Sequence, residues 1–155
     1  MRISPLSPTN GMSDSDPVAT FSQAARDLDA LGVAYLHVIE PGVNGTLSTP
    51  ASAHSPELAS GFFRPMFTGA IVAAGGHSAQ TGAARIQHDQ ADLIAYGQLF
   101  IANPDLPARF RLNAPLARPQ RATFYGGGAA GYTDYPALED LRYQGSYVCP
   151  ECHGG

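Results

Sequence analysis

Short apolar runs of strand length recur along the chain, and segments with helical periodicity lie between them. The run from Val33 to Ile39 is almost continuously apolar, which is typical of a parallel strand that helices cover on both faces. Short apolar strands that alternate with helical segments predict βα units and a parallel sheet, and therefore an α/β fold. We expect parallel strands near residues 2–4, 33–39, 70–75 and 92–96.

Capping and breaking residues mark the expected helix boundaries. Asp16 before Pro17 predicts a helix start, because the carboxylate can cap the first N–H groups and proline at the first helical position loses no donor. Gly32 predicts the end of this helix, since glycine readily adopts positive φ. Further helices are expected over residues 78–88 and 104–112.

Composition and charge narrow the class of protein. The chain has 155 residues, 44% of them hydrophobic and 14% charged, and a net charge of −4. This composition excludes a disordered chain and allows a substantial core. No apolar run approaches the roughly 18 residues that a membrane span needs. No stripe of Lys and Arg side chains offers a surface for a nucleic acid. Residues 1–10 lack the apolar core of a signal peptide. We therefore expect a cytoplasmic protein with no membrane or nucleic-acid partner.

Both cysteines fall in the sequence Cys149-Pro-Glu-Cys152-His153. The spacing matches c-type haem attachment and also half of a zinc site. A zinc ion needs four ligands, and only these three side chains are offered. We favour a solvated tail without a metal, and a zinc ion shared between two chains is the alternative.

Paired glycines follow the strand near residues 70–75. Gly75-Gly76 stands between this strand and the next helix, where backbone N–H groups and the helix dipole can bind an anion. A tight turn that needs positive φ explains the pair equally well. Gly97-Gln98 repeats the arrangement after the next strand. Two glycine-ended strands at one sheet edge raise the likelihood of a shared phosphate cradle, and both interpretations stay open.

Aromatic residues flank a glycine-rich loop near the C-terminus. Gly126, Gly128 and Gly131 match the dinucleotide pattern G-x-G-x-x-G, but no apolar strand precedes them and no amphipathic helix follows. We reject a dinucleotide site there. Phe124 and Tyr125 could stack on a planar ligand or pin the loop to the core.

The histidines show no metal-site or nucleophile spacing. His37 lies in an apolar strand and is predicted to be a hydrogen-bonded core residue. His77 directly follows the glycine pair and is placed to face the same pocket.

A series of motifs follows in one order from residue 2 to about 140. They are Arg2-Ile-Ser-Pro, Met12-Ser-Asp-Ser-Asp-Pro17, Gly32-Val-Ala-Tyr-Leu-His37, Phe63-Arg-Pro65, Ala74-Gly-Gly76, Ala91-Asp-Leu-Ile-Ala-Tyr-Gly97, Phe100-Ile-Ala-Asn-Pro-Asp-Leu106, Phe124-Tyr-Gly-Gly-Gly128 and Gly131-Tyr-Thr-Asp-Tyr-Pro136. Each is weak alone, but the ordered set resembles the second half of the Old Yellow Enzyme family, the FMN-dependent ene-reductases.

This resemblance implies part of a (β/α)₈ TIM barrel, strands five to eight with their helices, over residues 1–140. Residues 141–155, with the Cys149–His153 motif, lie outside the family pattern and are expected to form a flexible tail. It implies FMN as cofactor and NAD(P)H as hydride donor. The implied reaction is the reduction of activated C=C bonds in small enones, or of nitro compounds.

The resemblance also assigns roles to individual residues. Arg2 would lie against the pyrimidine edge of the flavin, where a cation stabilises the charge that builds on reduction. Gly75, Gly76 and Gly97 would donate backbone hydrogen bonds to the FMN phosphate. Phe124 would cover the apolar edge of the ring, and Tyr125 would border the substrate pocket.

The chain departs from the family pattern in two ways. Gln98 stands where the family usually has arginine, so one neutral hydrogen bond replaces a charged fork on the phosphate. The family's proton donor and carbonyl-binding pair belong to the part before strand five, and no residue here matches them. No catalytic residue is therefore assigned.

Three hypotheses follow. The chain is an ene-reductase fragment that needs a complementary half-barrel, a flavin- or phosphate-binding half-barrel without turnover, or a truncated gene product without function. Open strand edges in a half-barrel would also favour self-association.

Overall fold

The computed structural model describes residues 1–44, 47–48, 57–126 and 128–143, and the chain divides into two compact units, residues 1–96 and 97–155. The domain boundary predicted near residue 140 stays a prediction. The elements of the first unit are β1 (Arg2–Ile3), η1 (Thr9–Gly11), α1 (Pro17–Ala30), β2 (Tyr35–Ile39), β3 (Val43–Asn44), β4 (Leu47–Ser48), α2 (Ser60–Phe63), β5 (Ala70–Ala74), α3 (Ala79–Gln87) and β6 (Leu93–Ala95). Those of the second are α4 (Gln98–Ala102), α5 (Leu106–Arg111), η3 (Arg121–Thr123) and α6 (Leu138–Tyr143).

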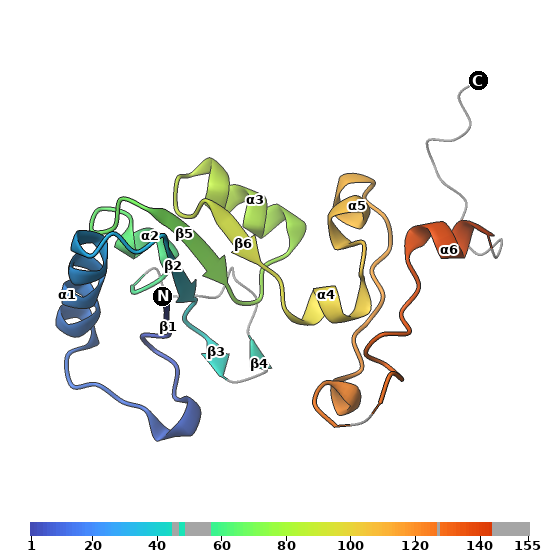
Figure 1. Ribbon diagram of the computed structural model, residues 1–155, viewed down its shortest axis with the longest axis horizontal. Coiled ribbons are helices and arrows are strands. Elements are labelled where there is room, and N and C mark those ends of the chain that lie inside the picture. Colours follow the sequence, from blue (N-terminus) through green and yellow to red (C-terminus); the bar gives the residue numbers. More distant parts are fainter. Residues whose placement is uncertain (45–46, 49–56, 127, 144–155) are drawn as a thin grey trace. The chain divides into compact units, whose positions relative to one another are not determined.

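The first unit is built on a parallel sheet with the strand order β1-β2-β5-β6 (Figure 1). All three pairings are parallel, and each connection between neighbouring strands contains a helix. This confirms the predicted α/β architecture, which is consistent with part of an α/β barrel. Parallel strands place their carboxyl ends at one edge, where ligands of such sheets usually bind.

Helix α1 begins and ends where its caps predict. The Asp16 side chain accepts a hydrogen bond from the N–H of Ala19 at 3.0 Å, and Pro17 is the first helical residue. Gly32 follows the helix with φ +67°. The helix expected over residues 78–88 is confirmed as α3, which lies between its caps Ser78 and His88.

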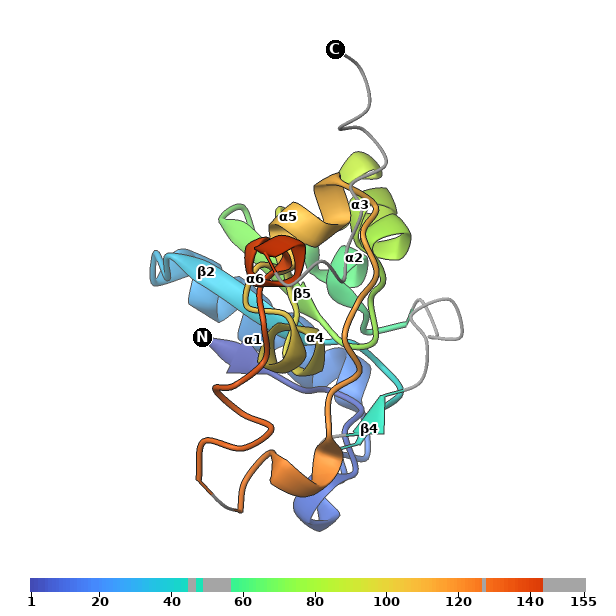
Figure 2. The same cartoon turned by 90° about the vertical axis from the view of Figure 1, so that its right-hand side faces the viewer.

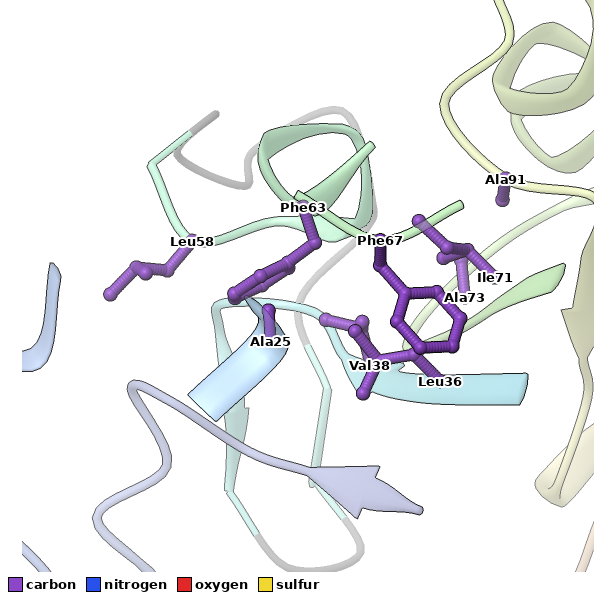
Figure 3. Close-up of a cluster of buried hydrophobic side chains, with 9 residues drawn as sticks. All are labelled: Ala25, Leu36, Val38, Leu58, Phe63, Phe67, Ile71, Ala73 and Ala91. Carbon is purple, nitrogen blue, oxygen red and sulfur yellow. The ribbon is translucent and has the colours of Figure 1, made fainter. Parts of the chain in front are cut away.

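One face of the sheet packs against helices. Leu36 and Val38 of β2 form one buried cluster with Ala25 of α1, Phe63 of α2 and Phe67, and all five side chains are essentially inaccessible (Figure 3). Burying a large apolar side chain contributes about 1.5–3 kcal/mol. This cluster therefore fixes α1 and α2 on β2 and β5.

The prediction that both faces of residues 33–39 are buried is wrong for the opposite face. Tyr35 of β2 is 50% exposed and Leu93 of β6 is 57% exposed. Side chains alternate along a strand, so these residues point away from the helix-covered face. Burial on the second face is confined to Ile39 at the carboxyl end, which is 8% exposed.

The Gly- and Ser-rich stretch after Gly42 contains regular structure that its composition does not predict. Strands β3 and β4 pair antiparallel, with Val43 opposite Ser48. Residues 49–56 lie outside the described part of the chain, and with them His54.

The regular elements in the described part of the second unit are the helices α4, α5, η3 and α6, joined by segments without regular structure (Figure 2). Buried Arg109 of α5 donates to Asp105 Oδ1 at 2.6 Å, to the Pro115 carbonyl at 3.0 Å and to the Pro136 carbonyl at 2.7 Å. Asp105 Oδ2 in turn accepts from the N–H of Leu138 at 2.7 Å. These bonds tie the start of α6 to α5.

Candidate functional site

The Gly75-Gly76 turn has backbone conformations that glycine alone adopts readily. Gly75 has φ +141° and Gly76 has φ +60°. A Cβ on Gly75 would lie 2.6 Å from Val43 Cγ2 and 3.1 Å from Glu40 Cβ, so the packing also excludes a side chain. The turn interpretation of the pair is therefore confirmed, while its role in binding an anion stays a prediction.

The start of α3 is capped by its own side chains. The Ser78 hydroxyl accepts from the N–H of Thr81 at 3.1 Å, and Thr81 Oγ1 accepts from the N–H of Ser78 at 2.8 Å. This reciprocal arrangement occupies two of the donors that a helix start offers. An anion at this edge would therefore rely on the glycine turn before the helix more than on these two groups.

The second glycine turn leaves the sheet at the same edge. Ala74 of β5 and Ala95 of β6 are register partners, so Gly75 follows one strand end and Tyr96 the other. The Tyr96 hydroxyl donates to the Ser78 carbonyl at 3.1 Å, and burial raises the pKa of this phenol. Tyr96 thereby joins the end of β6 to the start of α3.

Gly97 differs from the first pair because the fold does not require glycine there. Its φ is −83°, which any residue adopts, and a Cβ would meet no atom within 4 Å. Gly97 caps α4, and exposed Gln98 is the first residue of that helix. The packing around Gly97 therefore does not itself require glycine. Whether Gly97 and Gly75-Gly76 contact one phosphate stays a prediction.

Arg2 lies beside a cavity of about 610 Å³ in the first unit. The cavity is lined mainly by residues 2–8 and 12–14, with Pro17 and Phe21 of α1. Its volume suits a drug-sized ligand. Arg2 is an exposed member of this lining, and its contact with the pyrimidine edge of the flavin stays a prediction.

His37 shares a register row with Arg2 and Val72 on the partly exposed sheet face. Its Nε2 is buried and accepts or donates no hydrogen bond within the described residues, so the predicted hydrogen-bonded core histidine is wrong at this atom. Burial, together with the positive charges of Arg2 and the terminal amino group, lowers the pKa of His37.

The aromatic pair of the second unit has one buried and one exposed member. Phe124 is 7% exposed and Tyr125 is 87% exposed, and their rings meet edge to face with centroids 6.3 Å apart. Thr123 fixes the adjacent backbone by donating to the Gln120 carbonyl at 2.7 Å and the Gly131 carbonyl at 3.0 Å. Phe124 therefore anchors the loop, and Tyr125 presents its ring outward.

The rejected dinucleotide pattern is also unsupported in the structure. The segment before Gly126 is the short 3₁₀ helix η3, not a strand. The tail residues Cys149, Cys152 and His153 lie outside the described part of the chain. Within that part, no group of three His, Cys, Asp or Glu side chains could hold a metal ion.

Glu40 is the residue that the sequence interpretation missed. It directly follows β2, is 1% exposed, and has Ser60, His77 and Arg85 around its carboxylate. His77 is itself buried beside Glu40, and whether its side chain also faces the pocket stays a prediction. A charged residue at the end of the apolar run Val33–Ile39 was the available signal.

Comparisons with known proteins identify the family. The sequence pattern of the NADH:flavin oxidoreductase / NADH oxidase family matches residues 1–117. This match covers more than half of the chain, and the chain belongs to this family of oxidoreductases, which includes the old yellow enzymes.

Individual relatives agree with this assignment. A 12-oxophytodienoate reductase-like protein of Solanum lycopersicum is 43% identical over 86% of this chain and 35% of its own length. The 12-oxophytodienoate reductase 1 of Oryza sativa subsp. japonica is 42% identical over 91% of this chain and 37% of its own length. The chain thus spans little more than a third of these relatives.

Solved structures lead to the same class. The old yellow enzyme homologue from Zymomonas mobilis superposes with a TM-score of 0.78 and 37% identity, over 88% of this chain and 38% of that one. Morphinone reductase gives 0.76 and 40%, over 90% of this chain and 36% of that one. Among the described residues, no helix has the length and apolarity to cross a membrane.

Proposed function

We propose that this chain provides the phosphate- and pyrimidine-binding part of an FMN-dependent ene-reductase, corresponding to strands five to eight of its barrel. The phosphate would be bound by the Gly75-Gly76 turn and by Gly97, with a single hydrogen bond from Gln98. Family membership supports FMN as the ligand.

The observation that carries this proposal is the open backbone of Gly97. The protein's own packing leaves room for a Cβ at this position, and its φ of −83° suits any residue. A ligand that must reach the backbone explains a glycine where the fold does not require one. The strand end at Ala95 is in register with that at Ala74, so Tyr96 and Gly75 leave the sheet at the same edge.

Ring contacts are proposed for both units. Arg2, at the rim of the 610 Å³ cavity, would place its positive charge at the pyrimidine edge of the flavin. Phe124 would cover the apolar edge of the ring, and Tyr125, with its exposed ring, would border the substrate.

Bound FMN would supply the redox chemistry, the reduction of activated C=C bonds at the expense of NAD(P)H. Relatives named 12-oxophytodienoate reductase and morphinone reductase support a reductase of small organic molecules. Enones and nitro compounds are the proposed substrates, and a complementary half-barrel is the proposed partner for turnover. The role of this chain is to bind and orient the flavin.

Flavin fluorescence titration of the full chain tests the proposal. We expect FMN to bind more tightly than riboflavin, which lacks the phosphate. Gly97→Ala should weaken FMN binding about tenfold by displacing one charge-assisted hydrogen bond, and leave riboflavin binding unchanged. Gly126→Ala is the matched control, because a Cβ there also meets no atom within 4 Å. Equal affinities for FMN and riboflavin would contradict the proposal.

A further inference from the structure

Glu40 lies directly behind the Gly75-Gly76 turn. Its backbone N–H donates to the Ala74 carbonyl at 2.8 Å, which extends the β2–β5 ladder by one bond to the last residue of β5. Its Cβ is one of the atoms that a side chain on Gly75 would meet. Glu40 and the first residue of the turn are therefore in close contact.

The carboxylate of Glu40 joins the elements on both sides of this turn. Oε1 accepts a hydrogen bond from the Ser60 hydroxyl at 2.7 Å and a longer one from the Ser60 N–H at 3.4 Å. Oε1 also lies 3.9 Å from Nε2 of His77, which immediately follows the glycines. Oε2 lies 3.5 Å from Nη2 of Arg85 on α3.

Stability alone is a poor explanation for this cluster. The Glu40 side chain is completely inaccessible, and a buried ion pair often contributes no more than an apolar pair of the same volume. An apolar residue would also avoid the cost of desolvating a carboxylate. What an apolar residue cannot provide is the hydrogen bond from Ser60 of α2 to β2, together with a negative charge beside Arg85 of α3 and close to His77.

We propose that Glu40 is a positioning residue for the phosphate-binding turn. By lying beside His77 and Arg85 at once, its carboxylate holds the segment from Gly75 to His77 in one conformation against α3. The backbone N–H groups of the turn are thereby oriented before the ligand arrives, which reduces the entropy lost on binding. The Arg85 guanidinium offsets the negative charge that Glu40 places behind a phosphate site. The identity of the ligand in this inference rests on the proposed function. The claim that Glu40 orders the turn does not.

The first experiment measures the turn without any flavin. Amide hydrogen exchange of the full chain is compared between wild type, Glu40→Gln and the control Glu139→Gln, whose side chain is exposed on α6. Glu40→Gln should accelerate exchange at residues 75–78 about fivefold or more, with α1 unchanged. No acceleration at residues 75–78, or equal acceleration in α1, would overturn the proposal.

The second experiment measures selectivity for the phosphate. Glu40→Gln should weaken FMN binding about tenfold and leave riboflavin binding unchanged, whereas general loss of structure would weaken both. Ser60→Ala removes one hydrogen bond and keeps the charge, so it provides a milder variant with a smaller effect in the same direction if Glu40→Gln does not fold. A wild-type ratio of FMN to riboflavin affinity that persists in both variants would overturn the inference. A wild-type chain that does not bind FMN would instead refute the proposed function, while hydrogen exchange still decides whether Glu40 orders the turn.

Discussion

The glycines proposed for phosphate binding are of two kinds. Gly75 and Gly76 are required by their positive φ, and Gly75 also by the contact with Val43 and Glu40. Neither backbone conformation nor packing requires glycine at position 97. A glycine there is therefore better explained by a ligand than the glycines at 75 and 76 are. All three positions were singled out in the sequence because glycine after a strand is a strong local signal, and their role in binding a phosphate stays a prediction. It did not predict the role of Glu40, because its partners Ser60 and Arg85 are distant in sequence.

Gln98→Arg should tighten FMN binding about fivefold. A guanidinium offers the phosphate a charged, forked donor where glutamine offers one neutral N–H, a difference of roughly 1 kcal/mol. Flavin fluorescence titration at fixed salt measures the effect. Gln87→Arg, which adds the same charge at the far end of α3, should change the affinity little. An unchanged affinity in Gln98→Arg would remove Gln98 from the phosphate site.

The carboxylate of Asp92 should make stability depend on pH. A hydrogen bond from Arg64 at 2.6 Å, with a second from the N–H of Ile71, lowers the pKa of Asp92. A depressed pKa contributes stability above the ordinary carboxyl pKa, which is lost as the pH falls through the folded-state value. Asp92→Asn should therefore destabilise the chain near neutral pH, and by less as the pH falls below about 4.

Urea unfolding between pH 7 and pH 3 measures this difference. Because the Asp92 side chain is 44% exposed, we expect at most about 1 kcal/mol. Asp89→Asn is the control, since Asp89 is 84% exposed and 3.9 Å from Arg64. A difference between wild type and Asp92→Asn that stays constant with pH would argue against this ion pair.

At the scale of elements, local signals predicted the helices that carry their own caps. Asp16 and Gly32 bound α1 as expected, and α3 begins after the Ser78 cap. The five-residue helix α4 was missed, because so short an element has no periodicity to detect. The β3–β4 hairpin was missed for a related reason, since each strand has two residues.

The Arg109–Asp105 pair should be the main polar connection within the second unit. Asp105→Asn leaves a buried guanidinium without its carboxylate and weakens the bond that holds the start of α6. Breaking such a pair costs about 3 kcal/mol. Burial raises the pKa of Asp105, but the hydrogen bonds from Arg109 and the Leu138 N–H outweigh it, so the net pKa is lowered.

Denaturant unfolding or hydrogen exchange of α5 and α6 measures the effect of Asp105→Asn. The exposed control Glu139→Gln should change stability by less than about 0.5 kcal/mol. Equal behaviour of the two variants would contradict a structural role for the pair.

At the scale of the whole molecule, the parallel four-stranded sheet was predictable and its burial was not. Apolar runs located β2, β5 and β6, but they could not show that one sheet face is partly exposed, since a strand pattern does not state what covers it. Strands β1 and β6 form the two edges of this sheet. Unpaired edges favour association with further strands.

The chain alone, supplied with FMN and NADPH, should not reduce 2-cyclohexenone or N-ethylmaleimide. By the resemblance to the old yellow enzymes, the proton donor and carbonyl-binding pair have no match here, and general acid catalysis contributes about 10²–10⁴-fold. NADPH oxidation measures the rate, with morphinone reductase as the positive control. Substrate-dependent oxidation by the purified chain would contradict this expectation.

The central claim is that the glycine turns after β5 and β6 bind one FMN phosphate. The most direct measurement is amide chemical-shift mapping of the isotope-labelled chain, titrated in parallel with FMN and riboflavin. We predict that the amides of Gly75, Gly76 and Gly97 shift together with FMN, with one shared saturation curve, and do not shift with riboflavin. Shifts of equal size with riboflavin, or no shift at these glycines while FMN binds elsewhere, would contradict the account.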